Sequence, residues 1–136
     1  MKTALYFSLL ILVGSLQAKA PIKGDWITAS YVRVLAHPER FNGKRILLRG
    51  FYRRAFEHSA LYLSEGDAKM PNYEQGIWIG SPKKSEFKIE YPKRGWCRVL
   101  GTFHYRKHDN DPGSGGGHMG LWFAEIRDVE VLARQE

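Results

Sequence analysis

Apolar and polar residues alternate along several short segments of the chain, which is the pattern of strands that bury one face. The clearest segment is Lys44–Tyr52, in which Ile46 and Leu48 alternate with Arg45 and Arg49. Four further segments carry a strand pattern: Ala60–Leu63, Gly76–Ile79, Trp96–Tyr105 and Leu121–Leu132. The pattern therefore predicts five strands.

Glycines interrupt two of these strands. Gly50 stands inside the first and Gly101 inside the fourth, and a glycine within a strand marks a bulge or a sharp bend. The alternation of the last strand slips by one residue near Asp128, which also predicts a bulge. Short strands that bend can close on themselves and leave no open edge. We therefore predict an all-β fold, a small five-stranded Greek-key OB-fold-like barrel, with an SH3-like barrel or a β-sandwich fragment as the competing interpretation.

The segment before the first strand has helical rather than alternating spacing. Its apolar positions are Ile27, Tyr31, Val34 and Leu35. Asp25 and Thr28 are candidate caps, and Pro38 ends the segment, so a short N-terminal helix is predicted. Between the second and third strands, Ser64–Gln75 is predicted to form a loop.

The first twenty residues have the pattern of an export signal. A basic Lys2 precedes the apolar run Ala4–Gly14, and the small residues of Ala18-Lys19-Ala20 follow. We predict a signal peptide over residues 1–20, cleaved after Ala18 or Ala20, and a single OB-fold-like domain over residues 21–136. The expected location is the periplasm or the medium. An uncleaved segment would instead anchor the chain to a membrane.

The composition is basic and almost free of cysteine. The full chain has a net charge of +7, and removal of Lys2 and Lys19 with the signal leaves about +5. A basic surface attracts phosphates, anionic polysaccharides or lipid headgroups, but export makes nucleic acid the less favoured partner. The single Cys97 excludes an internal disulfide, and its place in the strand pattern predicts a buried thiol.

A set of short motifs resembles a group of uncharacterised bacterial proteins with OB-like folds. The matching motifs are Pro38-Glu39, Gly43-Lys44, Gly50-Phe51, Glu57, Leu61-Tyr62-Leu63, Ile77-Trp78, Gly101-Thr102-Phe103 and Gly117-His118-Met119-Gly120. The chain departs from the pattern at His37, where the group has asparagine, at Phe41, where it has tyrosine, and in a long insertion over residues 107–116. The resemblance implies the fold and no activity.

The residues before the last strand include a cluster of possible metal ligands. These are His104, His108, Asp109, Asp111 and His118. The four-residue spacing of His104 and His108 places two ligands on one face only in a helix, whereas His104 ends a predicted strand. The prediction is therefore a solvated loop, with no metal and no cofactor.

No motif of a known hydrolase is present, so catalysis is the alternative rather than the leading hypothesis. Glu57 precedes the second strand close to Arg53 and Arg54, where an ion pair is expected. The alternative function is a small envelope enzyme, with or without a metal, that uses His104, His118 and Glu57.

A binding surface is the leading hypothesis, because OB barrels bind ligands across the second and third strands and between the first and last hairpin loops. The predicted ligand-binding residues are Arg53, Arg54, Tyr62, Trp78, Arg106, Lys107 and His118. Aromatic rings flanked by cations can stack on bases or sugars, although Tyr62 and Trp78 could equally pack under the helix or a loop. A separate, solvated basic stretch is assigned to Lys83, Lys84, Lys93 and Arg94. The predicted function is an exported noncatalytic binding module for an anionic or sugar-containing polymer or for a partner protein.

Overall fold

The structure is a computed structural model that describes residues 24–83, 89, 91–106, 116–117 and 120–135. The predicted signal segment lies outside the described residues. The elements are β1 (Ile27–Ala29), α1 (Tyr31–Ala36), the short 3-10 helix η1 (Pro38–Arg40), β2 (Arg45–Ala55), β3 (His58–Tyr62), α2 (Glu65–Lys69), β4 (Ile77–Ile79), β5 (Arg94–Tyr105) and β6 (Ala124–Arg134).

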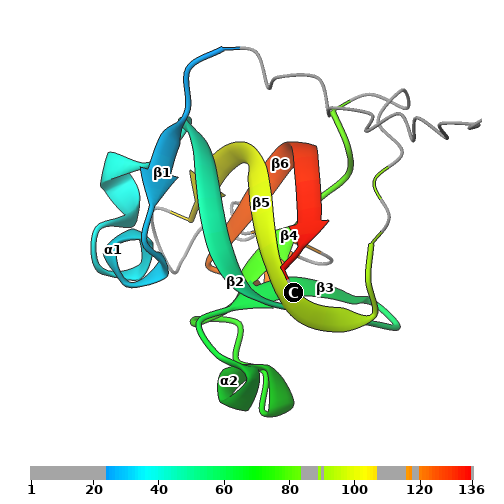
Figure 1. Cartoon of the computed structure of the whole chain (residues 1–136). Helices are drawn as coiled ribbons and strands as arrows, with labels where there is room; N and C mark the ends of the chain where they lie inside the picture. Colours follow the sequence, from blue (N-terminus) through cyan, green and yellow to red (C-terminus); the bar gives the residue numbers. More distant parts are fainter. Residues whose placement is uncertain (1–23, 84–88, 90, 107–115, 118–119, 136) are drawn as a thin grey trace, which may run out of the picture.

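Five of the strands close into a barrel (Figure 1). β2 pairs with β3, β3 with β4, β4 with β6, β6 with β5, and β5 returns to β2. The β4–β6 pair is parallel and the other pairs of this ring are antiparallel. This order is the Greek-key connection of an OB-like barrel, so the predicted fold is confirmed.

The barrel interior is filled by the side chains that the alternation predicted to face inward. Ile46, Leu48 and Val99 are completely buried in it. Cys97 is also fully buried, as predicted. Burial raises the pKa of its thiol to about 11, so the thiol stays protonated and unreactive at neutral pH.

The two mid-strand glycines lie where another strand crosses closely. A β-carbon on Gly50 would lie 2.6 Å from the carbonyl oxygen of Tyr62, and one on Gly101 would lie 2.7 Å from that of Arg127. The β5–β6 register shifts at Gly101, and Asp128 opposite has a φ of 48°. The bulge predicted near Asp128 is therefore confirmed.

The N-terminal helix is shorter than predicted. Residues Ile27–Ala29 form β1, which pairs in parallel with β2, and the helix starts only at Tyr31. Its cap is Ser30, whose hydroxyl accepts a hydrogen bond from the Arg33 N–H at 3.2 Å. The assignment of Ile27 to the helix, with Asp25 and Thr28 as caps, was wrong because the edge of β2 offers this segment interstrand hydrogen bonds.

A second helix lies within the segment predicted to be a loop. Ser64 caps α2 by accepting a hydrogen bond from the Asp67 N–H at 3.1 Å. The helix buries Ala68 in a cluster that contains Phe51 of β2. The sequence of α2 is mostly polar, and the helix is stabilised by this contact with a distant strand. The local sequence therefore predicted a loop instead of a helix. Figure 1 shows α1 beside β1 and α2 below β2 and β3.

Candidate polyanion-binding face

The aromatic residues predicted to stack on a ligand lie in a cluster on the outer side of β3 and β4. Tyr62 is completely buried, and its hydroxyl shares a hydrogen bond with Nε2 of His58 at 3.0 Å. Trp122 covers this side, with ring centroids 6.3 Å from Tyr62 and 5.6 Å from the half-buried Trp78. Tyr62 thus presents no ring face to a ligand, and Trp78 presents only part of its own.

The three described arginines of the predicted site make different contacts. Arg53 donates a hydrogen bond to the Ala68 carbonyl at 2.7 Å, which ties β2 to α2. Arg54 is exposed and its guanidinium lies 5.5 Å from the ring centroid of Tyr91. Arg106 is half-buried at the end of β5.

Lys107 and His118, predicted to complete the site, lie outside the described residues, as do His108, Asp109 and Asp111. Arg53 and Arg54 follow each other on β2 and therefore point to opposite faces of the strand. Arg53 lies on the same face as the buried Tyr62, because Arg53 pairs with Ala60 and Phe51 pairs with Tyr62.

Two residues of the alternative enzyme, Glu57 and His104, lie at opposite ends of the β2–β5 ladder, and its third residue, His118, lies outside the described residues. Glu57 lies exposed in the β2–β3 turn, next to the end of β2 that pairs with the start of β5. His104 lies near the other end of β5, where burial first and Arg127 second lower its imidazole pKa. Within the described part of the chain, no group of three His, Cys, Asp or Glu side chains could hold a metal ion.

A different surface combines aromatic rings with cations. Three directly opposite pairs occupy alternate positions along the outer face of the β2–β5 ladder: Arg49 with Arg98, Phe51 with Trp96, and Arg53 with Arg94. We call these six residues the arginine–aromatic face. Their neighbours Gly50, Tyr52 and Cys97 are buried on the inner side, as the two-residue period of a strand requires.

The aromatic pair at the centre of this face is only partly covered. Phe51 and Trp96 meet edge to face with ring centroids 5.8 Å apart. The guanidinium of Arg49 lies 5.2 Å from the Trp96 centroid, in a cation–π arrangement. Trp96 remains 38% exposed, whereas Phe51 is 7% exposed. Trp96 therefore still offers part of its ring to a ligand.

The two arginine pairs oppose folding. Like charges directly opposite in a sheet destabilise it by roughly 0.2–1 kcal/mol for each pair. Arg94 is partly compensated by an ion pair with Glu65 of α2, at 3.0 Å. The face nevertheless carries positive charge on both sides of the aromatic pair.

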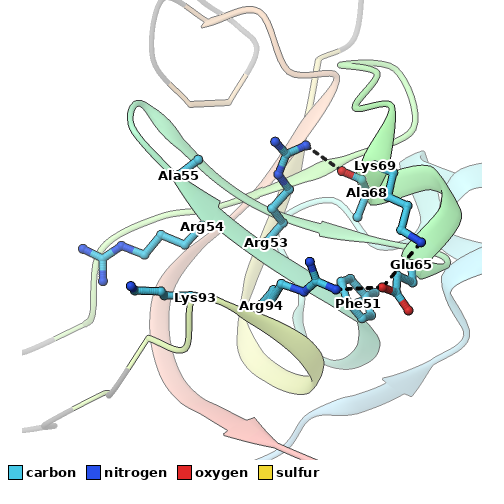
Figure 2. A pocket seen from close by; sticks show the side chains of 9 residues that line it. All are labelled: Phe51, Arg53, Arg54, Ala55, Glu65, Ala68, Lys69, Lys93 and Arg94. Atoms are coloured by element: carbon cyan, nitrogen blue, oxygen red, sulfur yellow. Dashed lines mark hydrogen bonds and ion pairs between the residues drawn. The ribbon is translucent and has the colours of Figure 1, made fainter.

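A pocket of about 390 Å³ continues this face between β2, α2 and the start of β5. Its lining residues are Phe51, Arg53, Arg54, Ala55, Glu65, Ala68, Lys69, Lys93 and Arg94. Figure 2 shows Lys69 and Arg94 directed at Glu65, while Arg54 and Lys93 extend together in another direction. Cations thus outnumber carboxylates in the lining of this pocket.

The sequence contained a signal for this face. Residues 49–53 and 94–98 both follow the pattern arginine, glycine, aromatic, any residue, arginine. Only the strand register shows that the two copies lie directly opposite each other. Lys93 and Arg94, assigned above to a separate solvated stretch, line the pocket.

No family model, curated protein or solved structure matches this chain. In the described ranges, the structure contains no helix of the length and apolar character needed to cross a membrane.

Proposed function

We propose that this protein is a noncatalytic binding module for an anionic polymer, which it holds on the arginine–aromatic face and the adjoining pocket. The observation that carries the proposal is the register of β2 and β5, which sets two opposed arginine pairs around an aromatic pair. Such an arrangement costs folding energy. A ligand with several negative charges removes that cost when it binds.

The chemistry of the face suits a chain of anionic units. Arginine forms paired hydrogen bonds with phosphate or carboxylate groups. The exposed part of Trp96 can stack on a sugar or a base. The spacing of charge, ring and charge along each strand matches a ligand that alternates charged groups with flat or ring-shaped ones.

The predicted export of residues 21–136 favours an anionic polysaccharide of the cell envelope over a nucleic acid. A partner protein with an acidic surface would use the same cations, and it is the remaining candidate if neither polymer binds.

The test is to measure binding of the purified protein to oligogalacturonate, single-stranded DNA and neutral dextran over a range of salt concentrations. Trp96→Ala should weaken binding to the charged ligands about tenfold at every salt concentration, because it removes stacking. Arg98→Ala should chiefly reduce the salt dependence, by about 0.7 in the slope of log K against log salt for single-stranded DNA.

Arg33→Ala is the matched control, because Arg33 is an exposed arginine of α1 outside the proposed face. If Arg33→Ala reduces the salt dependence as much as Arg98→Ala, only the overall charge matters and the proposed site is wrong. Failure of the wild-type protein to bind either charged ligand would also contradict the proposal.

A further inference from the structure

The turn between β2 and β3 exposes a large apolar side chain. Ala55 pairs with His58, so Phe56 and Glu57 alone make the connection. Phe56 is 92% exposed, the highest value among the exposed large apolar side chains of the described residues. Glu57 has a φ of 50°, in the left-handed region.

Neither Phe56 nor Glu57 is a residue that stabilises a two-residue hairpin turn. Two-residue hairpin turns favour Asn-Gly or Asp-Gly, because asparagine and glycine adopt a positive φ with less strain than glutamate. An almost fully exposed phenylalanine contributes no burial to the core. A local sequence that departs from folding preferences in two ways points to a role in binding.

Cations stand directly behind this turn. The backbone N–H of Arg54 donates a hydrogen bond to the Lys93 carbonyl at 2.8 Å, which joins the residue before Arg94 to the hairpin. Arg54 and Lys93 are both exposed. Figure 2 shows their side chains extending together, with Ala55 nearby on the same hairpin. Glu57, in the turn itself, carries a negative charge that partly offsets these two cations.

We infer that the β2–β3 turn docks on the surface of a bilayer that contains anionic phospholipids. Phe56 enters the boundary between headgroups and acyl chains, which is where exposed aromatic residues of peripheral proteins are buried. Arg54 and Lys93 contact the lipid phosphates, and each cation near an anionic surface adds to the attraction. The carboxylate of Glu57 stays among the hydrated headgroups.

This docking goes beyond the proposed polymer binding and uses a different residue at its centre. Phe56 follows β2, whereas Trp96 lies inside β5 opposite Phe51. The turn would hold the protein at a membrane while the arginine–aromatic face takes up the polymer. Arg54 and Lys93 line the pocket as well as the turn, so the two interactions are removed separately through Phe56 and Trp96.

The experiment is flotation of the predicted mature chain, residues 21–136, with vesicles of phosphatidylcholine, alone or mixed equally with phosphatidylglycerol. The predicted signal segment is left out because its apolar run Ala4–Gly14 would itself insert into either bilayer. The protein should bind the mixed vesicles and not the neutral ones. Because Phe56→Ser removes the inserted aromatic ring, it should lower partitioning about tenfold or more, while Phe56→Leu should retain most of it. Denaturant unfolding of each variant checks that the fold is kept.

Val32→Ser is the matched control, because Val32 is an apolar side chain of α1 with 59% exposure. It should bind the vesicles as the wild type does. Wild-type partitioning of Phe56→Ser would show that charge alone attracts the protein, and equal losses for Phe56→Ser and Val32→Ser would show nonspecific adsorption. Either result overturns the inference.

Cross-testing separates this inference from the polymer proposal. Phe56→Ser should bind oligogalacturonate normally, and Trp96→Ala should bind vesicles normally. If Phe56→Ser loses both ligands, the turn belongs to the polymer site and the membrane inference is wrong. If the wild type binds vesicles through Phe56 but neither charged polymer, the polymer proposal fails and the membrane inference holds.

Discussion

Two aromatic surfaces on the outside of the same barrel differ in what covers them. On β3 and β4, Trp122 packs over Tyr62 and Trp78 and is itself only 2% exposed. On β2 and β5, Trp96 stays 38% exposed beside arginines. Phe51 joins the two surfaces, because it contacts Trp96 and also belongs to the cluster that contains Trp122.

The covered surface is built from close backbone approaches. A β-carbon on Gly76 would lie 2.4 Å from the Trp122 ring, and one on Gly117 would lie 2.5 Å from it. Glycine at these two places lets the indole lie directly on the backbone. The comparison teaches that aromatic content alone does not identify a binding surface on this barrel, since a tryptophan from the β5–β6 connection can turn such a surface into a second core.

The largest expected difference between the two surfaces is in stability. Trp122→Ala should lower the free energy of unfolding by about 3 to 5 kcal/mol, because it empties a buried site between two glycines. Trp96→Ala should cost less than about 1 kcal/mol, since its ring is partly in water. Urea denaturation of both variants measures this. Equal losses would mean that Trp96 is a structural residue as well.

The covered surface should also respond to pH. Burial first and Arg53 second lower the pKa of His58 below its usual value of 6.5. The unfolded chain therefore takes up this proton before the folded chain does, so stability is complete above pH 6.5 and is lost as the pH falls through the folded pKa.

Denaturant midpoints between pH 5 and pH 8 test this linkage. His58→Gln should flatten the decline below pH 6.5, and the pKa of His104, also lowered by burial, should leave a smaller residual slope. A His58→Gln variant with an unchanged pH profile would contradict the linkage.

The smallest expected effect is a gain in stability on the open face. Arg98→Thr removes one of two directly opposed arginines and places a β-branched residue in a strand, so the free energy of unfolding should rise by about 0.5 kcal/mol. Polyanion binding should weaken in the same variant. Loss of stability would show that Arg98 supports the fold, and the argument from like-charge pairs would then fail.

The sequence predicted the barrel strands well because each strand buries one face. Ile46 and Leu48 are buried at alternate positions between Arg45 and Arg49, so a local period of two was sufficient. The segment at Ile27–Ala29 could not be assigned in this way. Its strand structure depends on the edge of β2, which lies elsewhere in the chain.

The candidate site was predicted only in part. Arg53 and Arg54 were identified because cations flank a hairpin, and both line the pocket. Tyr62 and Trp78 were proposed as stacking residues because nothing local indicated that Trp122 would cover them. Trp96 was missed because its importance comes from Phe51 and Arg49.

The sequence by itself determined the five barrel strands, their inward-facing side chains and the positive charge of this protein, because these depend on residue type and on a short period along the chain. The tertiary structure alone decided which outer surface is covered and which arginines stand opposite each other. The register of β2 and β5 and the position of Trp122 arise from pairing between distant segments, and no local pattern contains that information.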